Sequence, residues 1–388
     1  MNHSATRKIH IHHHHYIHNI LDAVGTFVRK NTVLCIAVLA AAVTSVIVPP
    51  DAEYLGYFDF RTLTCLFCTL AVICALKNIR FFTIVAQKIV YCTGNLRMAI
   101  LALVYITFIG SMLIANDMAL LTFLPLGFFV LSSTGKRSHM AFTFIMQNIA
   151  ANLGGMLTPF GNPQNLYLYS KFNIPDGEFI SIMFPPFALA ITLITVCCLF
   201  VKPEKLSLES RDDSKLPVGR TLIYLALFAF SILIVFRVIP YVLGLALIPL
   251  ALLLLDRSAL KKVDYALLFT FVAFFIFAGN MARIPAVREL FSYLLDQSTL
   301  IFSTVSCQFI SNVPSAILLS QFTDNYRELL VGVNIGGAGT LIASLASLIT
   351  FREYTKNNPG KTLSYIGMFS AFNFGFLAIL LVFSFFIM

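Results

Sequence analysis

The chain has 388 residues, of which 58% are hydrophobic and only 12% are charged, and its formal net charge is +9. Because about a quarter of the residues of a soluble domain are charged, this composition excludes an ordinary soluble protein and predicts an all-α polytopic membrane protein. The positive charge does not indicate nucleic-acid binding, since the basic residues stand in short stretches between apolar segments, where orientation signals are found.

The N-terminal stretch, residues 1–32, is predicted to form a polar arm on the cytoplasmic side. It carries a histidine cluster between His10 and His15, which is typical of an expression tag or of a disordered native extension. No apolar core stands before a cleavage site here, so we expect no signal peptide.

Residues 33–201 are predicted to hold the first span and the first of two repeats. Asn116 and Asp117 interrupt the apolar stretch Met98–Leu131. A helix rises 1.5 Å per residue, and neither arm with its polar tip is long enough to cross a hydrocarbon core of about 30 Å. We therefore predict that this stretch forms a re-entrant hairpin. The other predicted elements are the spans Val33–Pro49 and Phe60–Leu76, the interfacial helix Phe81–Tyr91, the broken span Met140–Tyr169 and the span Phe179–Val201.

Residues 202–220 read as a charged cytoplasmic linker, residues 221–255 as two connecting spans, and residues 256–388 as a second repeat. A second hairpin, Leu300–Phe322, has its polar tip at Ser311 and Asn312. The remaining predicted elements are the spans Thr221–Val238, Tyr241–Leu255 and Tyr265–Gly279, the amphipathic helix Arg283–Asp296, the broken span Leu329–Thr350 and the span Ser364–Met388. The sum is about nine full spans and two hairpins.

One pattern, N-x-G-G-x-x-T, occurs once in each repeat, at Asn152–Thr158 and at Asn334–Thr340. Paired glycines weaken a helix, and in hydrocarbon such a break is tolerated only inside the protein or beside a wet cavity. Matched breaks in two halves of a membrane protein indicate the binding site of a transporter. The linker places an odd number of spans between corresponding elements, so we expect the two repeats to be inverted.

The distribution of lysine and arginine supports this topology. With the N-terminus inside, 21 of the 27 lysines and arginines fall on inner segments, as the positive-inside rule requires. The first hairpin then opens on the cytoplasmic side and the second on the outer side.

Asparagine marks both hairpin tips, at Asn116 and Asn312, and opens both breaks, at Asn152 and Asn334. Side-chain amides donate and accept hydrogen bonds without a full charge. Half-helix N-termini attract anions, and exposed carbonyls hold small cations. These residues therefore predict a site for an anionic substrate flanked by cations. The alternative is that they cap and kink helices for packing alone.

A single acidic residue, Asp117, stands between Asp59 and Asp176. A carboxylate within the membrane is a functional candidate by default. It could carry a proton, bind sodium or pair with a cation such as Arg97. The second hairpin has Val313 at the equivalent place, so the acid is not part of the repeat.

The chain shows no phosphate-binding loop and no H-E-x-x-H or G-x-S-x-G pattern, so we expect no enzyme. The cysteines are expected to behave as small hydrophobic residues, and Cys65-x-x-Cys68 is not expected to bind metal. No cofactor is predicted beyond a sodium ion or a proton as coupling ion.

These motifs resemble those of the ion transporter superfamily, and within it the citrate-transporter-like and arsenite-permease-like bacterial members. The resemblance extends from Thr62 to the C-terminus. Its motifs are I-A-N-D-M-A-L-L-T-F-L-P around Asn116, L-T-P-F-G-N-P-Q-N at Leu157–Asn165, S-N-V-P-S-A-I-L-L-S at Ser311–Ser320 and V-N-I-G-G-A-G-T-L-I-A-S-L-A-S at Val333–Ser347. It implies an inverted-repeat transporter whose scaffold domain dimerises.

The resemblance also implies roles for individual residues. Together with the sequence itself it indicates substrate binding by Asn116, Asp117, Asn162, Ser311, Asn312 and Pro314. Cation binding is indicated for Ser111, Asn116, Asn152, Gly155, Thr158, Asn312, Asn334, Gly337 and Thr340. The first tip departs from the Ser-Asn-Thr of the related divalent anion–sodium symporters, and Asp117 would repel a dianion unless it were protonated or paired.

We therefore predict a secondary active transporter of an inorganic or small organic anion, of the citrate or dicarboxylate class, coupled to sodium or protons. The alternatives are an arsenite or antimonite efflux permease, a sodium–proton antiporter that uses Asp117, and a non-transporting membrane receptor. The expected location is the plasma membrane of a bacterium, with several passes and the N-terminus in the cytoplasm.

Overall fold

The computed structural model describes residues 25–28, 31–206 and 215–388, so most of the predicted N-terminal arm and part of the linker lie outside the described residues. The helices of the first half are α2 Thr32–Ile47, α3 Phe60–Asn78, α4 Phe81–Tyr91, α5 Leu96–Ile114, α6 Asn116–Ser133, α7 Met140–Gly154, α8 Pro163–Lys171 and α9 Asp176–Leu199. Three short 3₁₀ turns, Ala52–Tyr57, Arg137–His139 and Gly155–Leu157, join them.

The second half is built in the same way. Its helices are α10 Val218–Val235, α11 Tyr241–Leu255, α12 Arg257–Lys261, α13 Tyr265–Arg283, α14 Pro285–Gln297, α15 Thr299–Ile310, α16 Asn312–Leu319, α17 Tyr326–Ile335, α18 Leu345–Asn357 and α19 Thr362–Ile387. The described residues contain helices and connecting loops but no β-strand.

Seven of these helices (α3, α5, α6, α9, α10, α13 and α19) are long and apolar enough to cross a membrane. The predicted class, an all-α polytopic membrane protein, is confirmed. The helices α2 and α11, with 16 and 15 residues, were predicted as full spans and are apolar but shorter than these seven.

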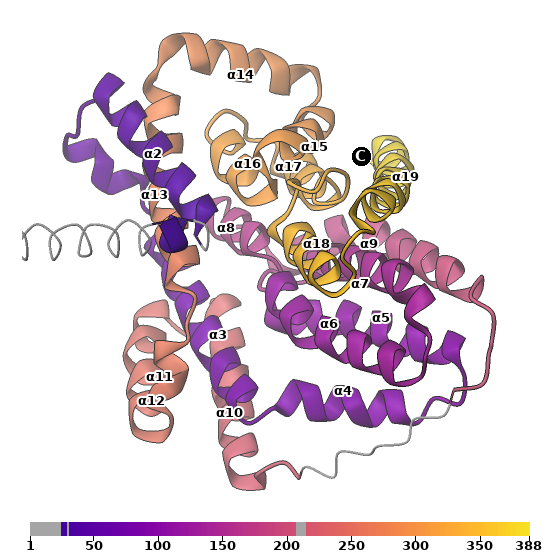
Figure 1. Cartoon of the computed structure of the whole chain (residues 1–388). Helices are drawn as coiled ribbons and strands as arrows, with labels where there is room; N and C mark the ends of the chain where they lie inside the picture. The colour runs from indigo at the N-terminus through magenta and orange to yellow at the C-terminus, as the bar shows by residue number, and fades with distance from the viewer. Residues whose placement is uncertain (1–24, 29–30, 207–214) are drawn as a thin grey trace, which may run out of the picture.

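The molecule has two parts that lie side by side (Figure 1). One part contains α2, α3 and α10 to α13, in which α2 packs on α13 and α3 packs on α10 and α11. The other part contains α5 to α9 and α15 to α19, in which α5 packs on α7 and α15 on α17. The short helix α8 contacts α3 in the first part and α16 in the second, so it lies at the border between the parts.

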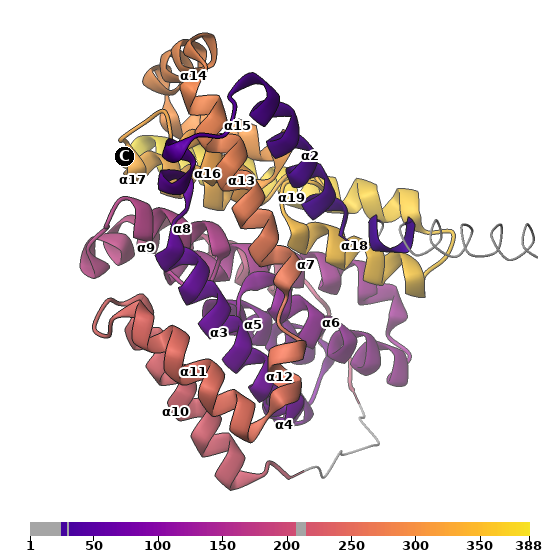
Figure 2. The ribbon, with the colours of Figure 1, turned by 90° about the vertical axis from the view of Figure 1, so that its left-hand side faces the viewer.

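Two helices predicted as amphipathic or interfacial, α4 and α14, connect the parts. Each follows a helix of the first part and leads into a hairpin of the second part. They lie at opposite ends of the molecule, α14 at the top and α4 at the bottom (Figures 1 and 2). Each therefore links the two parts within its own half of the chain.

The two hairpins turn in the same way. Ala115 between α5 and α6 has φ 62°, and Ser311 between α15 and α16 has φ 74°. The asparagine that follows each of them accepts a hydrogen bond from the next backbone N–H, of Asp117 and Val313, both at 2.9 Å. One residue thus makes each turn, and the next helix begins at once.

The arms of the first hairpin are longer than the sequence indicated, because Asn116 and Asp117 belong to α6 instead of to a separate polar tip. The helices α5 and α6 have 19 and 18 residues, whereas α15 and α16 have only 12 and 8. By length alone each arm of the first hairpin could cross a membrane.

Replacing Ala115 with glycine is expected to raise the apparent melting temperature of the purified protein. A non-glycine residue at this backbone conformation is strained by about 1–3 kcal/mol, whereas glycine loses only about 0.5–1 kcal/mol through the entropy of the unfolded chain. Ala119→Gly, within α6, is the matched control and is expected to lower the melting temperature. A lower melting temperature for Ala115→Gly would contradict strain at this turn.

Candidate functional site

The hairpin tips and the helix breaks meet at the centre of the second part of the molecule. Nδ2 of Asn116 donates a hydrogen bond to Oδ1 of Asn152 at 3.1 Å, which joins the first tip to the first break. A Cβ atom on Gly337 would lie 3.2 Å from Nδ2 of Asn312 and 3.8 Å from Oδ1 of Asn152, so the second tip lies against the second break and close to the first. The sequence predicted this convergence, and the three asparagines, like Asn334, are all buried.

Asn334 connects the two breaks. Its Oδ1 accepts hydrogen bonds from Nδ2 of Asn162 at 3.1 Å and from Nε2 of Gln164 at 3.3 Å. Its Nδ2 donates to Oδ1 of Asn165 at 2.5 Å and to the carbonyl of Leu330 at 2.8 Å. We call the set Asn116, Asn152, Asn162, Gln164, Asn165 and Asn334 the amide cluster.

Three polar atoms at this centre are buried without a hydrogen-bond partner in the described part of the chain: Asn152 Nδ2, Asn162 Oδ1 and Gln164 Oε1. Oδ1 of Asp117, which follows the first tip, is a further such atom. Buried polar groups nearly always have a partner, and each exception needs an explanation. One donor and two acceptors gathered at one place are what a small polar ligand would satisfy. The site offers more acceptors than donors, which favours a ligand that carries O–H or N–H groups.

The repeats match at the level of single contacts. Oγ1 of Thr158, in the first break, donates to the carbonyl of Met112 at 2.8 Å, and Oγ1 of Thr340, in the second break, donates to the carbonyl of Gln308 at 3.0 Å. Met112 and Gln308 occupy the same place, four positions before the tip asparagine of their hairpins. Each break is therefore fastened to its hairpin by the same hydrogen bond.

The remaining predicted residues lie around this centre. Oγ of Ser311 donates to the carbonyl of Ala343 at 3.3 Å, and the backbone N–H of Asn312 donates to the same carbonyl at 2.9 Å, so the second tip is tied to the end of its break. Pro314 is buried in the first turn of α16. The hydroxyl of Ser111 donates to the carbonyl of Phe108 at 2.8 Å within its own helix.

One functional candidate, Gln308, was missed in the sequence. Its Nε2 donates to the carbonyls of Gly336 at 2.8 Å and Ala338 at 3.1 Å in the second break. A single glutamine in an apolar segment gave no local pattern. The available signal was its position in the repeat. When the two hairpins are aligned on Asn116 and Asn312, Gln308 stands opposite Met112, so this place is polar in one repeat and apolar in the other.

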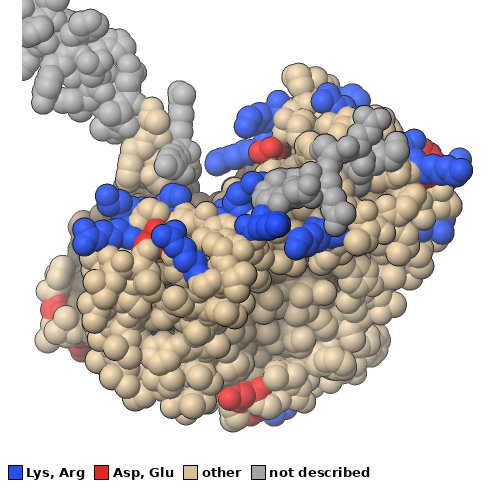
Figure 3. All heavy atoms as spheres, turned by 90° about the horizontal axis from the view of Figure 1, so that it is seen from below, with Lys and Arg blue, Asp and Glu red and all other residues tan. Residues whose placement is uncertain are grey.

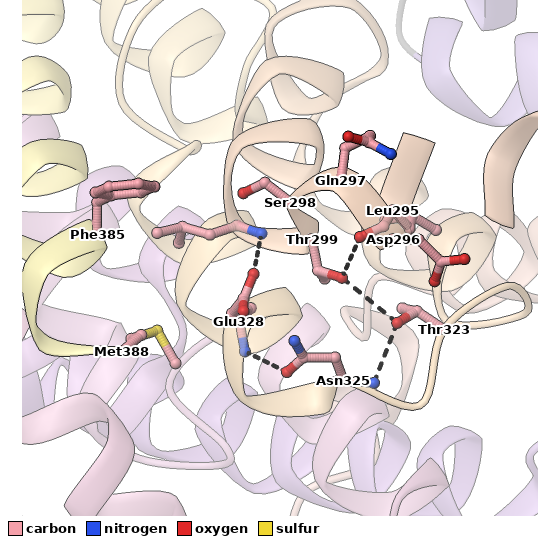
Figure 4. A pocket seen from close by; sticks show the side chains of 11 residues that line it. Leu295, Asp296, Gln297, Ser298, Thr299, Thr323, Asn325, Glu328, Phe385 and Met388 are labelled. Carbon is pink, nitrogen blue, oxygen red and sulfur yellow. Dashed lines mark hydrogen bonds between the residues drawn. The ribbon is translucent and has the colours of Figure 1, made fainter. Parts of the chain in front are cut away.

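A separate cavity of about 400 Å³ lies at the other end of the second hairpin. Figure 4 shows Thr299, Thr323, Asn325 and Glu328 around it, with the Glu328 carboxylate accepting from the backbone N–H of Leu300 at 2.8 Å. Thr299 begins α15 and the hairpin tip follows the end of α15, so a helix length separates this cavity from the amide cluster. The two are different sites.

The apolar helices define a multi-pass membrane protein. The sequence profile of the citrate transporter family matches residues 20–326, and the chain belongs to that family. The match includes both hairpins and the first break, and it ends before the second break begins.

The individual relatives are named as a transporter or as membrane proteins. The chain is 32% identical over 301 residues to an uncharacterized transporter of Methanocaldococcus jannaschii, covering 77% of this chain and 82% of that protein. It is 29% identical over 290 residues to the inner membrane protein YbiR of Escherichia coli, covering 70% and 74%. It is 23% identical over 326 residues to a 46 kDa membrane protein of Mycobacterium leprae, covering 69% and 75%.

Asn334→Ala is expected to lower the free energy of unfolding by about 1–3 kcal/mol, because the buried amides of Asn162, Gln164 and Asn165 each lose a partner. Chemical or thermal denaturation in detergent measures this loss. The variant is also expected to lose transport.

The matched control for this variant is Asn280→Ala. Asn280 is a buried amide of α13, where it donates to Thr44 at 3.3 Å and Ser45 at 3.2 Å, outside the amide cluster. It is expected to lose stability to a similar extent and to keep transport. Equal transport by the two variants, corrected for folded protein, would show that the cluster is only structural.

Proposed function

We propose that this protein is a secondary active transporter that moves a small inorganic or organic anion through the amide cluster. The observation that carries the proposal is the meeting of two hairpin tips and two helix breaks around unpartnered buried polar atoms. The family membership supports transport but does not name the substrate. No enzymatic activity is proposed, because these groups bind and release a solute without providing a nucleophile or a paired acid and base.

The chemistry of the site favours a small and weakly charged anion. The helix α8 begins just after the first break, and α16 begins at the second hairpin tip. Their positive ends at the centre would stabilise negative charge. The hydrogen bonds that join the amide cluster within the described residues are made by amides and carbonyls and not by lysine or arginine. Asp117 adds negative charge, so a dianion would need a protonated or cation-paired Asp117.

An arsenite or antimonite permease is the second candidate. The observation in its favour is the excess of unpartnered acceptors, Asn162 Oδ1, Gln164 Oε1 and Asp117 Oδ1. A neutral or singly charged oxyacid carries hydroxyl groups that would donate to these three oxygens. A sodium–proton antiporter, in which Asp117 exchanges the two ions, is the third.

The division into two parts supports a mechanism for alternating access. We propose that the part holding the hairpins and breaks moves as a body against the part built from α2, α3 and α10 to α13, in an elevator-like or rocking motion. The helices α4 and α14 connect the parts at opposite ends of the molecule, where they could act as arms (Figure 1). A homodimer formed through the scaffold part is proposed by family analogy.

The distribution of charge supports a proposal for the orientation in the membrane. Lysine and arginine gather in a band across one side of the face shown in Figure 3, beside a wide uncharged surface. Exposed members of the predicted inner segments include Arg80, Lys88, Arg137, Lys202, Lys205, Arg257, Lys261 and Lys356. By the positive-inside rule we propose that this side faces the cytoplasm, that the N-terminus lies there, and that the membrane is the plasma membrane of a bacterium.

A transported anion is expected to raise the melting temperature of the purified protein. A ligand that binds only the folded state stabilises it by RT ln(1 + [L]/Kd), about 2.7 kcal/mol at a hundredfold excess over Kd. The measurement is a thermal unfolding screen across citrate, dicarboxylates, inorganic oxyanions and arsenite. Asn116→Ala and Asn312→Ala should lose the response, and Asn280→Ala should keep it. Stabilisation that survives in both tip variants would contradict the proposed site.

If Asp117 carries the coupled proton, Asp117→Asn is expected to abolish accumulation driven by a pH gradient while keeping exchange of substrate for substrate. The reason is that an amide cannot take up and release a proton, whereas exchange needs only binding and movement. Transport into proteoliposomes with and without a pH gradient measures both. Retained uphill accumulation in the variant would exclude this role for Asp117.

A further inference from the structure

We propose that Arg237, in the turn between α10 and α11, is a latch that holds the two parts of the molecule together in one position and is released when they move. The inference rests on the proposed function, because only an alternating-access motion requires the parts to separate. Arg237 belongs to the part built from α2, α3 and α10 to α13, and its side chain reaches the end of α8 in the other part. A contact across this border must break whenever one part moves against the other.

The guanidinium of Arg237 contacts the end of α8 in three ways. Its Nη1 donates to the carbonyl of Ile174 at 3.1 Å, and its Nη2 donates to the carbonyl of Tyr169 at 2.6 Å. The guanidinium carbon also lies 4.0 Å from the centre of the Tyr169 ring, which is within the range of a cation–π interaction. The two carbonyls lie at the negative end of the α8 dipole, where a cation is stabilising. A positive side chain of one part thus caps a helix of the other part.

The backbone of Arg237 has the left-handed conformation that glycine usually provides at the end of a helix, with φ 63°. Its N–H donates to the carbonyl of Ile234 at 3.1 Å. The N–H of Val238 donates to the carbonyl of Leu233 at 3.0 Å, which completes the Schellman pattern that closes a helix. A residue with a side chain is strained at this place. An arginine that is kept here in spite of the strain indicates that its side chain has a function.

The end of α8 that receives Arg237 is closed by the same pattern. Asn173, which follows α8, has φ 50°, and the N–H of Ile174 donates to the carbonyl of Tyr169 at 3.2 Å. The two residues whose carbonyls accept from Arg237 are therefore the two residues that close this turn. The hydroxyl of Tyr169 donates to the carboxylate of Asp176 in α9, which holds the ring in place against the guanidinium. The receiving surface is thus built by α8 and α9 alone.

The residue before Arg237 makes a second contact across the border. The ring of Phe236 packs edge-on against the ring of Phe160, with the ring centroids 5.9 Å apart. Phe160 lies in the first break, two residues before Asn162 of the amide cluster. One turn of the first part therefore touches the segment around α8 both before the helix begins and where it ends. A shift of that segment breaks both contacts together.

The contacts of Arg237 leave part of its guanidinium unsatisfied. Its Nε is buried without a hydrogen-bond partner in the described part of the chain. A buried donor without a partner costs free energy, and this cost is removed when the guanidinium moves into water. The side chain is therefore held by two hydrogen bonds and a ring, yet its release is easier than that of a fully satisfied arginine. This combination suits a contact that forms and breaks in every transport cycle.

The distance between the two parts tests the proposal. Spin labels at Val242 in α11 and Ile180 in α9, both exposed, report this distance on the full chain in proteoliposomes, in a background whose reactive native cysteines are replaced. Arg237→Gln is expected to lower the ratio of the position in this structure to any other position by at least about tenfold, because one hydrogen bond to a charged group is worth about that factor. An unchanged distribution of distances in this variant would overturn the latch.

Arg237→Gly separates the role of the side chain from that of the fold. Glycine relieves the strained backbone and removes the guanidinium, so this variant is expected to melt no lower than Arg237→Gln and to show the same shift in the ratio. Arg283→Gln is the matched control, because Nη2 of Arg283 pairs with Asp51 at 2.6 Å within one part. It is expected to keep the wild-type ratio. A shift of equal size in Arg283→Gln would overturn the latch, because the loss of any arginine would then be enough.

The same measurements separate this inference from the proposed function. A protein that transports an anion while both Arg237 variants keep the wild-type ratio keeps the function and loses the latch. A protein that binds no anion in the thermal screen, and in which both Arg237 variants shift the ratio, keeps the latch and loses the function.

Discussion

The structure depends on one constraint, which is that a backbone group freed inside a membrane must find a partner in the protein. Two helices of this chain, α7 and α17, stop at paired glycines, where the helical hydrogen bonding of their last carbonyls ends. The partners are side-chain amides, because an amide donates and accepts without bringing a charge into the membrane. Asn334 then joins the breaks to each other through Asn162 and Asn165. Two segments far apart in the sequence are held together by the need to satisfy both breaks.

The inverted repeat provides a symmetric frame, and the chemistry lies in its departures from symmetry. The turns at Ala115 and Ser311 and the threonine-to-carbonyl hydrogen bonds are the same in both halves. The acid at Asp117 and the amide at Gln308 occur in one half only. A symmetric frame therefore encloses an asymmetric site.

Much of this could be predicted from the sequence because membrane helices carry strong local signals. The helix Phe81–Tyr91 was predicted with both ends correct, since charge and hydropathy change abruptly there. The second break was predicted to end at Thr340 but continues to Ser344, because no glycine or proline marks where α18 begins. Gln308 was missed for a different reason. Its partners are carbonyls brought to it by the tertiary fold, and a partner of that kind has no signature in the neighbouring sequence.

The balance of charge at the centre limits what can be carried. The amides at the breaks are neutral, so they satisfy carbonyls but do not compensate the charge of a substrate, as two bound cations would. Without such cations a citrate or dicarboxylate ion would face the half-helix dipoles alone, and these amount to about half a charge each, against a carboxyl group at Asp117. A protonated oxyacid or a singly charged anion avoids this conflict, because its hydroxyl groups can donate to the unpartnered oxygens. Membership of the citrate transporter family thus describes the frame, while the groups at the centre favour a smaller and less charged cargo.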